Sequence, residues 1–464
     1  MSQPMLEIPV GERLASYVSG ALDAWPCQTH RQLAKLHILD TLAAIVACRD
    51  LEPAVLARNY ALSLSGGGDG PNAATILGTH ARASIVDAAF ASAMTGHGAE
   101  INDFIPSAFV QPGPAVLSAA LAIAETRGAS GAELLRAVMA GYELAGRMPK
   151  ALGVENLRRA GVANHGLGPL FGAATAAAIL LRLPADRIGD VFTFCAQQAS
   201  GSWQWLLDVE HIEKAFVFAG MGARDGLHAA LMVSAGFRGV RNALDHPGGW
   251  MRGAMFSGGD ANRAYLVDDL GERSELPLTA FKRYPVGGPT QPAVEALLDL
   301  SPAIAGQAVQ SVFIEMPGRW QAFRDAAMPA LNLRYLAAII LIDGRLDFVS
   351  AQSLTRMAQE EAVKDLMAKI EIAHDPAQEA APGSPRTESA RVRITLEDGR
   401  EFSRFVPHVL GFPSHPMDAA DVESKAFNLM VEHLGPERAQ AVIAAVRGIE
   451  TLPDCKPLIE LIAR

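Results

Sequence analysis

Apolar residues recur every three or four positions through most of the first 267 residues, which is the period of a helix with one buried face. RQLAKLHILDTLAAIVAC (31–48) and ELLRAVMAGYELAGRM (133–148) show this spacing. ATILGTHARASIVDAAFASAMTGHG (74–98) and GPLFGAATAAAILLRL (168–183) are apolar on most sides and rich in Ala and Gly. We expect the latter two to be closely packed core helices.

The pattern changes after about residue 268. AVQSVFIEM (308–316) and ARVRITLEDGREFSRFV (390–406) alternate with period two, and EDG in the second predicts a hairpin. The polar stretch at 374–390 reads as a loop, and 332–348 and 350–370 as helices.

From about residue 410 the helical period returns. The chain is therefore expected to be mainly α, with an all-helical domain from residues 1–267. Residues 268–409 would form a smaller α+β domain, and residues 410–464 a helical tail that can rejoin the first part, making it discontinuous.

Composition narrows the class of protein. Half of the 464 residues are apolar and 19% are charged, which is enough for a large core. The net charge is −10 and no basic block stands out, so nucleic acid is not expected as a partner. No apolar run reaches 18 residues, and the N-terminus lacks the features of a signal peptide. With four scattered cysteines and no CxxC pair, we expect a cytoplasmic protein with no membrane partner.

His165 directly precedes the glycine-rich run GLGPLFG (166–172), at what reads as a helix start. A helix N-terminus lowers the pKa of an imidazole and offers backbone N–H groups to anions, which suits a base beside a carboxylate substrate. A structural histidine is the alternative. The glycine spacing is G-x-G-x-x-x-G with no βαβ unit around it, so close helix packing explains it better than a dinucleotide loop does.

Lysines provide the next candidates. Lys214 enters an apolar, glycine-spaced helix, and its side chain either snorkels to solvent or points into a cleft. Lys282 and Arg283 precede a Pro/Gly turn, where a solvated loop is the alternative.

The loop TGHGAEINDFIPSAFVQPGP (95–114) places several polar residues between two apparently buried helices. Turn and cap chemistry would explain some of them, and a pocket wall would explain Glu100, Asp103 and Gln111. No HExxH motif or closely spaced His/Cys/Asp set predicts a metal.

Taken in order, several segments resemble the MmgE/PrpD family, which includes 2-methylcitrate dehydratase, cis-aconitate decarboxylase and iminodisuccinate epimerase. They are HILDTLAAIVA (37–47), HGAEINDF (97–104), QPGPAVLSAALAIAE (111–125), GYELAGR (141–147), NHGLGPLFGAATAAAILLRL (164–183), QQASG (197–201), the segment around Lys214, KRYPVGGPTQPAVEALL (282–298) and NLRYLAAIILIDGRLDF (332–348). The resemblance implies a helical domain built from both ends of the chain, a smaller α+β lid, a homodimer, and catalysis without metal or organic cofactor.

The resemblance also implies a site between the two domains. Carried over by position, the catalytic residues would be His165, Lys214 and Lys282. The substrate-binding set would be Glu100, Asp103, Gln111, Arg283, Gln291 and Tyr335. Gln111 and Gln291 stand where family dehydratases and decarboxylases usually have histidine, and glutamine carries no proton near neutrality.

We expect a lyase, such as a dehydratase, that moves a proton next to a carboxylate of a small di- or tricarboxylic acid. An epimerase or isomerase of a dicarboxylic acid, such as an iminodisuccinate-like compound, is the alternative. It needs only one acid and one base, which His165 and Lys214 can supply. A binding protein without activity and a dinucleotide-dependent oxidoreductase are the other two classes; the latter depends only on GLGPLFG.

Overall fold

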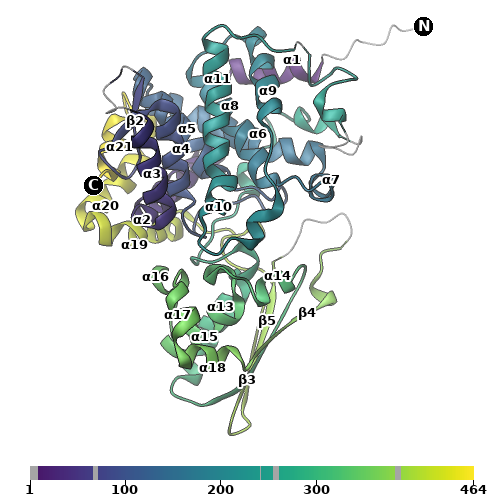
Figure 1. Cartoon of the computed structure of the whole chain (residues 1–464), viewed down its shortest axis with the longest axis vertical. Helices are drawn as coiled ribbons and strands as arrows, with labels where there is room; N and C mark the ends of the chain where they lie inside the picture. Colours follow the sequence, from purple (N-terminus) through teal and green to yellow (C-terminus); the bar gives the residue numbers. More distant parts are fainter. Residues whose placement is uncertain are drawn as a thin grey trace.

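Helices dominate the computed structural model, which describes residues 9–23, 25–65, 70, 72–240, 242–253, 261–381 and 388–464. Figure 1 shows a large helical part above a smaller part that contains a sheet. The helices of the N-terminal part are α1 (Val10–Ser19), α2 (Gln28–Cys48), α3 (Glu52–Leu64), α4 (Ile85–Gly96), α5 (Pro112–Arg127), α6 (Gly131–Leu152), α7 (Val154–Arg159), α8 (Asn164–Leu180), α9 (Ala185–Gln198), α10 (Ile212–Ala215) and α11 (Met221–Ser234).

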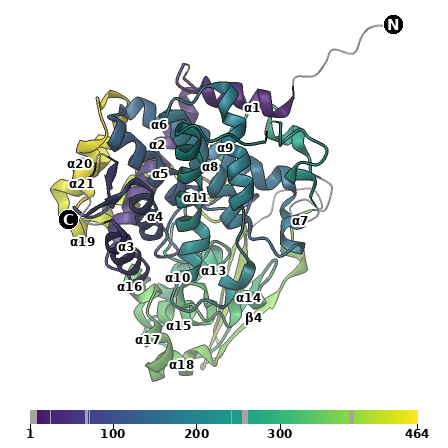
Figure 2. The ribbon, with the colours of Figure 1, turned by 45° about the horizontal axis from the view of Figure 1, so that its top comes forward.

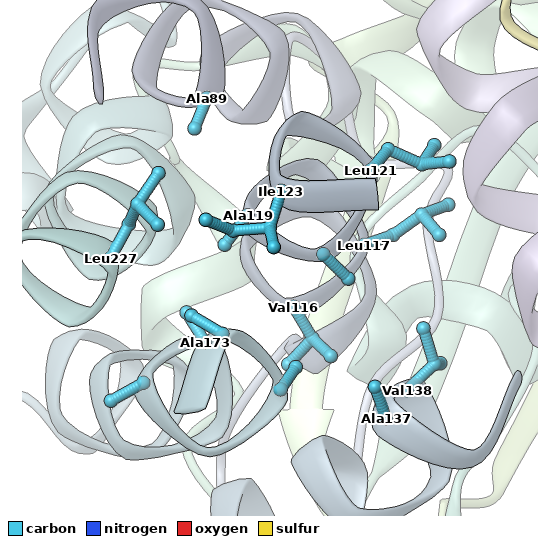
Figure 3. Close-up of a cluster of buried hydrophobic side chains, with 14 of the residues drawn as sticks. Ala89, Val116, Leu117, Ala119, Leu121, Ile123, Ala137, Val138, Ala173 and Leu227 are labelled. Atoms are coloured by element: carbon cyan, nitrogen blue, oxygen red, sulfur yellow. The ribbon is translucent and has the colours of Figure 1, made fainter. Parts of the chain in front are cut away.

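Helix α5 lies at the centre of the helical core. Figure 3 shows Val116, Ala119 and Ile123 of this helix among Ala173 of α8 and Leu227 of α11. These side chains are all fully buried. The alanines let the helix axes approach closely, as the Ala-rich sequence predicts, and the buried apolar surface supplies the main stabilisation.

Glycines allow the closest of these approaches. A Cβ atom on Gly168 would lie 2.5 Å from the carbonyl oxygen of Ala145, and one on Gly172 would lie 2.7 Å from that of Gly141. Both glycines are inside α8, packed against α6. The prediction that GLGPLFG serves helix packing is confirmed, and no phosphate-binding turn forms there.

The C-terminal helices α19 (Ala419–Leu434), α20 (Pro436–Arg447) and α21 (Lys456–Ile462) rejoin the helical part. Lys425 of α19 donates to Asp40 of α2 over 2.5 Å, and both side chains are buried. Figures 1 and 2 both show the yellow C-terminal helices on the same side of the helical part as α3, and α19 and α20 pack against α2. Both ends of the chain therefore build the helical core, as expected.

The smaller part, referred to below as the lid, carries a four-stranded sheet in the order β4-β3-β5-β6. Strands β3 (Val309–Met316), β5 (Ala390–Leu396) and β6 (Glu401–Val406) are antiparallel neighbours, and β4 (Ile370–His374) is parallel to β3. The predicted hairpin is confirmed, with Gly399 of its turn at φ +86°. The helices of the lid are α13 (Gln291–Ile304), α14 (Gln321–Arg324), α15 (Leu333–Asp343), α16 (Phe348–Ala351), α17 (Leu354–Gln359) and α18 (Glu361–Met367).

Two sequence predictions were wrong in detail. Residues 74–84 are not helical: β1 (Ala73–Thr75) and β2 (Arg82–Ser84) form a hairpin. The Glu125 carboxylate accepts bonds from the backbone and hydroxyl of Thr75 and from Arg82, which fixes both strands. The second error is the helical prediction for the end of 350–370: the helices stop with α18, and Ile370 begins β4, a strand that the pattern did not predict. The polar loop predicted at 374–390 lies partly outside the described residues. Among the described helices, none combines the length and apolar character needed to cross a bilayer.

Candidate active site

A cavity of about 290 Å³ lies between the helical part and the lid. Five of the predicted site residues line it: Glu100, Gln111, His165, Lys214 and Lys282. The lid contributes the loop 287–289 and residues between Arg319 and Leu331. The cavity thus gathers residues that are up to 288 positions apart in the chain, from Glu100 to Glu388.

Backbone pairing at the junction brings Lys282 to Glu100. Phe104 exchanges two hydrogen bonds with Ala280, of 3.0 and 2.7 Å, and Phe281 donates to the Gly411 carbonyl over 2.8 Å. A Cβ atom on Gly288 would lie 2.9 Å from Phe104, so a glycine is needed for the lid loop to pack here. The polar loop 97–111 is therefore fastened to the start of the lid.

Glu100 is the centre of a buried charged cluster. Lys282 Nζ donates to its Oε2 over 2.9 Å, Lys214 Nζ donates to its Oε1, and His211 Nε2 lies 3.2 Å from Oε1. All four residues are at most 5% exposed. One carboxylate between two ammonium groups leaves one surplus positive charge in a region of low dielectric, where a substrate anion would be attracted.

The chain geometry around Lys214 is unusual. His211 has φ +64° and precedes the single turn of α10, and Asp208 accepts from the Lys214 backbone N–H over 2.8 Å. The π-helical turn η2 (Phe216–Gly220) follows at once. Such turns insert an extra residue into a helix and are frequent at functional sites. Together these features direct Lys214 inward, so the cleft alternative predicted for this lysine holds and the snorkelling one does not.

Burial and charge act in opposite directions on this cluster. Burial alone would raise the pKa of Glu100, but the charges of Lys214 and Lys282 outweigh it and hold the pKa well below its usual value. Burial lowers the pKa of Lys214, and Glu100 offsets only part of that effect. Glu100 is therefore ionised at neutral pH, and Lys214 gives up a proton more easily than a solvated lysine does.

His165 lies in the first turn of α8. Its ring stacks on Phe218 with centroids 3.9 Å apart, and its Nδ1 is 3.0 Å from Gln111 Oε1. An amide oxygen only accepts, so Nδ1 carries the proton and the lone pair is on Nε2. Burial, helped by the charge of Lys214, keeps the pKa of His165 well below its usual value. The imidazole is therefore neutral and able to accept a proton.

Asp103 does not line the cavity. It is fully buried, where it accepts from the Tyr142 hydroxyl over 2.6 Å and from the Gly113 N–H over 3.2 Å. A Cβ atom on Gly113 would lie 2.3 Å from Thr41 Oγ1 and 2.7 Å from Asp103 Oδ1. This contact explains the glycine of QPGP and gives Asp103 a structural role at the start of α5.

Three further predicted residues also lie outside the cavity lining. Gln291 bonds the backbone of Tyr284 and Val286 through both ends of its amide, so it holds the lid loop from behind. The Tyr335 hydroxyl donates to the Ser350 carbonyl over 2.6 Å inside the lid. Arg283 is half-exposed and lies 3.8 Å from Glu295. Their predicted contact with substrate is not supported by these positions.

His97 lies behind the cluster and outside the cavity lining. Its Nδ1 is 2.7 Å from Asn102 Oδ1, and its ring stacks on Phe218. His97, Glu100 and His211 place possible ligand atoms within 4.8 Å of one another. However, Glu100 already accepts from two ammonium groups, and their charges oppose a metal cation at this position.

Aromatic residues are the part of the site that sequence reasoning missed. Trp203 and Trp205 of η1 (Trp203–Leu207) lie edge-on to the His165 ring, at 5.4 and 5.3 Å between centroids. Lys214 Nζ is 4.9 Å from the Trp205 ring. The signal was the cluster WQW in a chain with only five tryptophans. His211 was also missed, since a histidine in a polar turn carries no periodic signal.

A helical part and a lid that enclose an acid/base cluster define a two-part enzyme-like architecture. The family model for the MmgE/PrpD N-terminal domain matches residues 12–264, and the model for the MmgE/PrpD C-terminal domain matches residues 284–451. The chain therefore belongs to the MmgE/PrpD family. Comparison with curated proteins returned no match. Family membership supports an enzymatic role of the dehydratase, lyase or a related type.

Proposed function

We propose that this protein is a cofactor-independent lyase that eliminates water, or a comparable leaving group, next to the carboxylate of a small carboxylic acid. The observation that carries the proposal is that a neutral His165 lines the same cavity as Glu100 and the two lysines that donate to it. A base, a cation and an acid are thereby available within one enclosed space.

In the proposed reaction, His165 Nε2 removes the proton from the carbon beside the carboxylate. The electron pair of that C–H bond passes first toward the carboxylate, where Lys282 balances the growing negative charge. It then forms the carbon–carbon double bond as the neighbouring C–O bond breaks. The departing oxygen leaves as water with a proton from Lys214, whose lowered pKa favours the transfer.

Epimerisation of a carboxylic acid is the second candidate, and Gln111 is the observation that favours it. This residue contacts His165, where a family dehydratase usually has a histidine, so no second proton carrier is supplied beside the base. Removal and return of one proton needs only His165 and Lys214.

A thermal-shift screen of carboxylic acids, followed by incubation of the hits in deuterium oxide, tests the proposal. Loss of water or CO2 would support a lyase, and deuterium exchange with inversion would support an epimerase. Binding without exchange or product for every hit would count against both and favour a binding protein.

A further inference from the structure

The wall of the active-site cavity is mostly apolar, although one side of it holds the charged cluster. From this contrast we propose that the substrate is a monocarboxylic acid with a bulky apolar substituent, aryl or branched alkyl, rather than a di- or tricarboxylate. The inference rests on the proposed function, because it assigns the carboxylate to the Glu100–lysine cluster, defined here as Glu100, Lys214 and Lys282.

The balance of acidic and basic side chains in the cavity lining favours a substrate with a single carboxylate. Among the described lining residues, acidic and basic side chains are equal in number: Glu100, Glu155, Asp208 and Glu388 against Arg158, Lys214, Lys282 and Arg319. His165 adds no charge because burial depresses its pKa. The buried cluster has a surplus of one positive charge, which matches one carboxylate, whereas the remaining lining side chains, three acidic and two basic, have a surplus of one negative charge. A substrate with three carboxylates would leave two of them uncompensated in a confined space.

Arg158 and Arg319 do not change this balance. Arg158 is already bonded to Glu155, with Nε 2.7 Å from the carboxylate. Arg319 is exposed on the lid, where solvent screens its charge. Neither residue belongs to the buried cluster, so neither forms an enclosed second carboxylate site.

The apolar lining comes from both parts of the molecule. The helical part contributes the aromatic rings around His165 together with Phe109 and Leu206, and Leu206 is left 45% exposed at the cavity. The lid contributes Phe323 and smaller side chains: Ala322, Ala326, Ala327, Met328 and Leu331. Apolar and aromatic side chains of this kind are typical of pockets that bind apolar groups, and the polar side chains beside them fix the orientation of the ligand. A small, fully polar acid would not cover these apolar side chains, which would then remain in contact with water.

The cavity has room for such a substituent. A closed cavity of about 150 Å³ accommodates a benzene ring. The present cavity of about 290 Å³ therefore has space for a ring and for the carboxylate and reacting carbons beside it. An apolar group placed against Phe323 and Leu206 would be held while its carboxylate reaches the lysines.

A set of 3-hydroxy acids that differ only in the substituent tests the inference: 3-hydroxybutanoate, 3-hydroxy-5-methylhexanoate and 3-hydroxy-3-phenylpropanoate, compared with malate and citrate. Binding is measured by calorimetry, and turnover by loss of water and by deuterium exchange. We expect kcat/KM and affinity to rise about threefold or more per added methylene and to be highest for the two bulky acids. A tenfold preference for malate or citrate, or no binding of any bulky acid, would overturn the inference.

The two readouts separate this inference from the proposed function. Tight binding of the bulky acids without exchange or product would leave the substrate class standing and refute the lyase and epimerase reactions. Turnover restricted to malate or citrate would do the reverse.

Phe323→Ala gives a second test, with Phe313→Ala as a matched control. Phe313 is in β3 of the same lid and outside the cavity lining. Phe323→Ala should lower the ratio of kcat/KM for the phenyl acid to kcat/KM for 3-hydroxybutanoate about tenfold, while Phe313→Ala leaves this ratio unchanged. An equal loss on both acids, with circular dichroism showing a folded variant, would contradict the proposed apolar subsite.

Discussion

Replacing Glu100 by glutamine should remove the balance of the buried cluster while keeping its shape. Lys214 and Lys282 are 3% and 1% exposed, and the variant removes the carboxylate that both of them bond, so that Lys214 keeps only the weaker influence of Asp208. Removing one partner from a buried ion pair costs about 3–5 kcal/mol, because the remaining charge is uncompensated. We expect a loss of this size in the free energy of unfolding at pH 7, with turnover abolished because the lysines no longer hold their positions.

The loss should depend on pH in a defined direction. The pKa of Glu100 is held well below its usual value in the folded protein, so its contribution to stability is present above about pH 4.3 and is lost as the pH falls through the folded pKa. In the variant, Lys214 loses the partner that raises its pKa. A lysine with a lowered folded pKa binds fewer protons when folded, so the stability of the variant should rise with pH up to about 10.4. The difference from wild type should be largest near neutrality.

Urea denaturation at about pH 4, 7 and 10 measures this difference. Asp40→Asn is the control, because it also deprives a buried lysine, Lys425, of its carboxylate, yet Asp40 lies outside the cavity lining. The control should lose stability and keep turnover. A Glu100→Gln variant within about 1 kcal/mol of wild type at pH 7 would refute the reasoning, since the two ammonium groups would then need no counter-charge.

Further predictions concern the acid/base pair and the assembly. The profile of kcat/KM against pH should have an acid limb with its midpoint below the usual pKa of histidine, because His165 becomes protonated there. Its alkaline limb should have a midpoint below 10.5, because Lys214 loses its proton there. Midpoints at the unshifted values would contradict this. His165→Ala should lower kcat at least about 100-fold, and loss of its stack on Phe218 should cost about 1–3 kcal/mol, as measured by kinetics and denaturation. Gln111→His should impair the native reaction, because the amide that fixes the tautomer of His165 is lost. The variant should not by itself gain 2-methylcitrate dehydratase or cis-aconitate decarboxylase activity. Strong wild-type activity on 2-methylcitrate or cis-aconitate would show that Gln111 does not exclude these reactions. Light scattering at micromolar concentration should give the mass of a dimer, and a monomer would refute the expected homodimer.

Periodicity and composition were enough to predict most of the secondary structure. Helical spacing is a local property, so the segments that became α2, α6 and α19 could be recognised without knowing their partners. The same is true of the β5–β6 hairpin, whose turn residues are contiguous. β4 could not be recognised, because this segment of five residues forms a strand by pairing with β3, which is distant in the sequence.

Some features of the site could likewise be predicted from the sequence, and others could not. His165, Lys214 and Lys282 could be proposed from residue type, local context and resemblance. The contact of both lysines with Glu100 could not, because the approach of Lys282 to Glu100 depends on the backbone pairing of Phe104 with Ala280. Asp103 and Gln291 are polar residues in the right segments, but their partners are backbone groups and buried side chains rather than the cavity. A sequence states which groups a chain carries. Only tertiary packing decides which of them lose water and face one another, because burial and distance set both their charge and their partners.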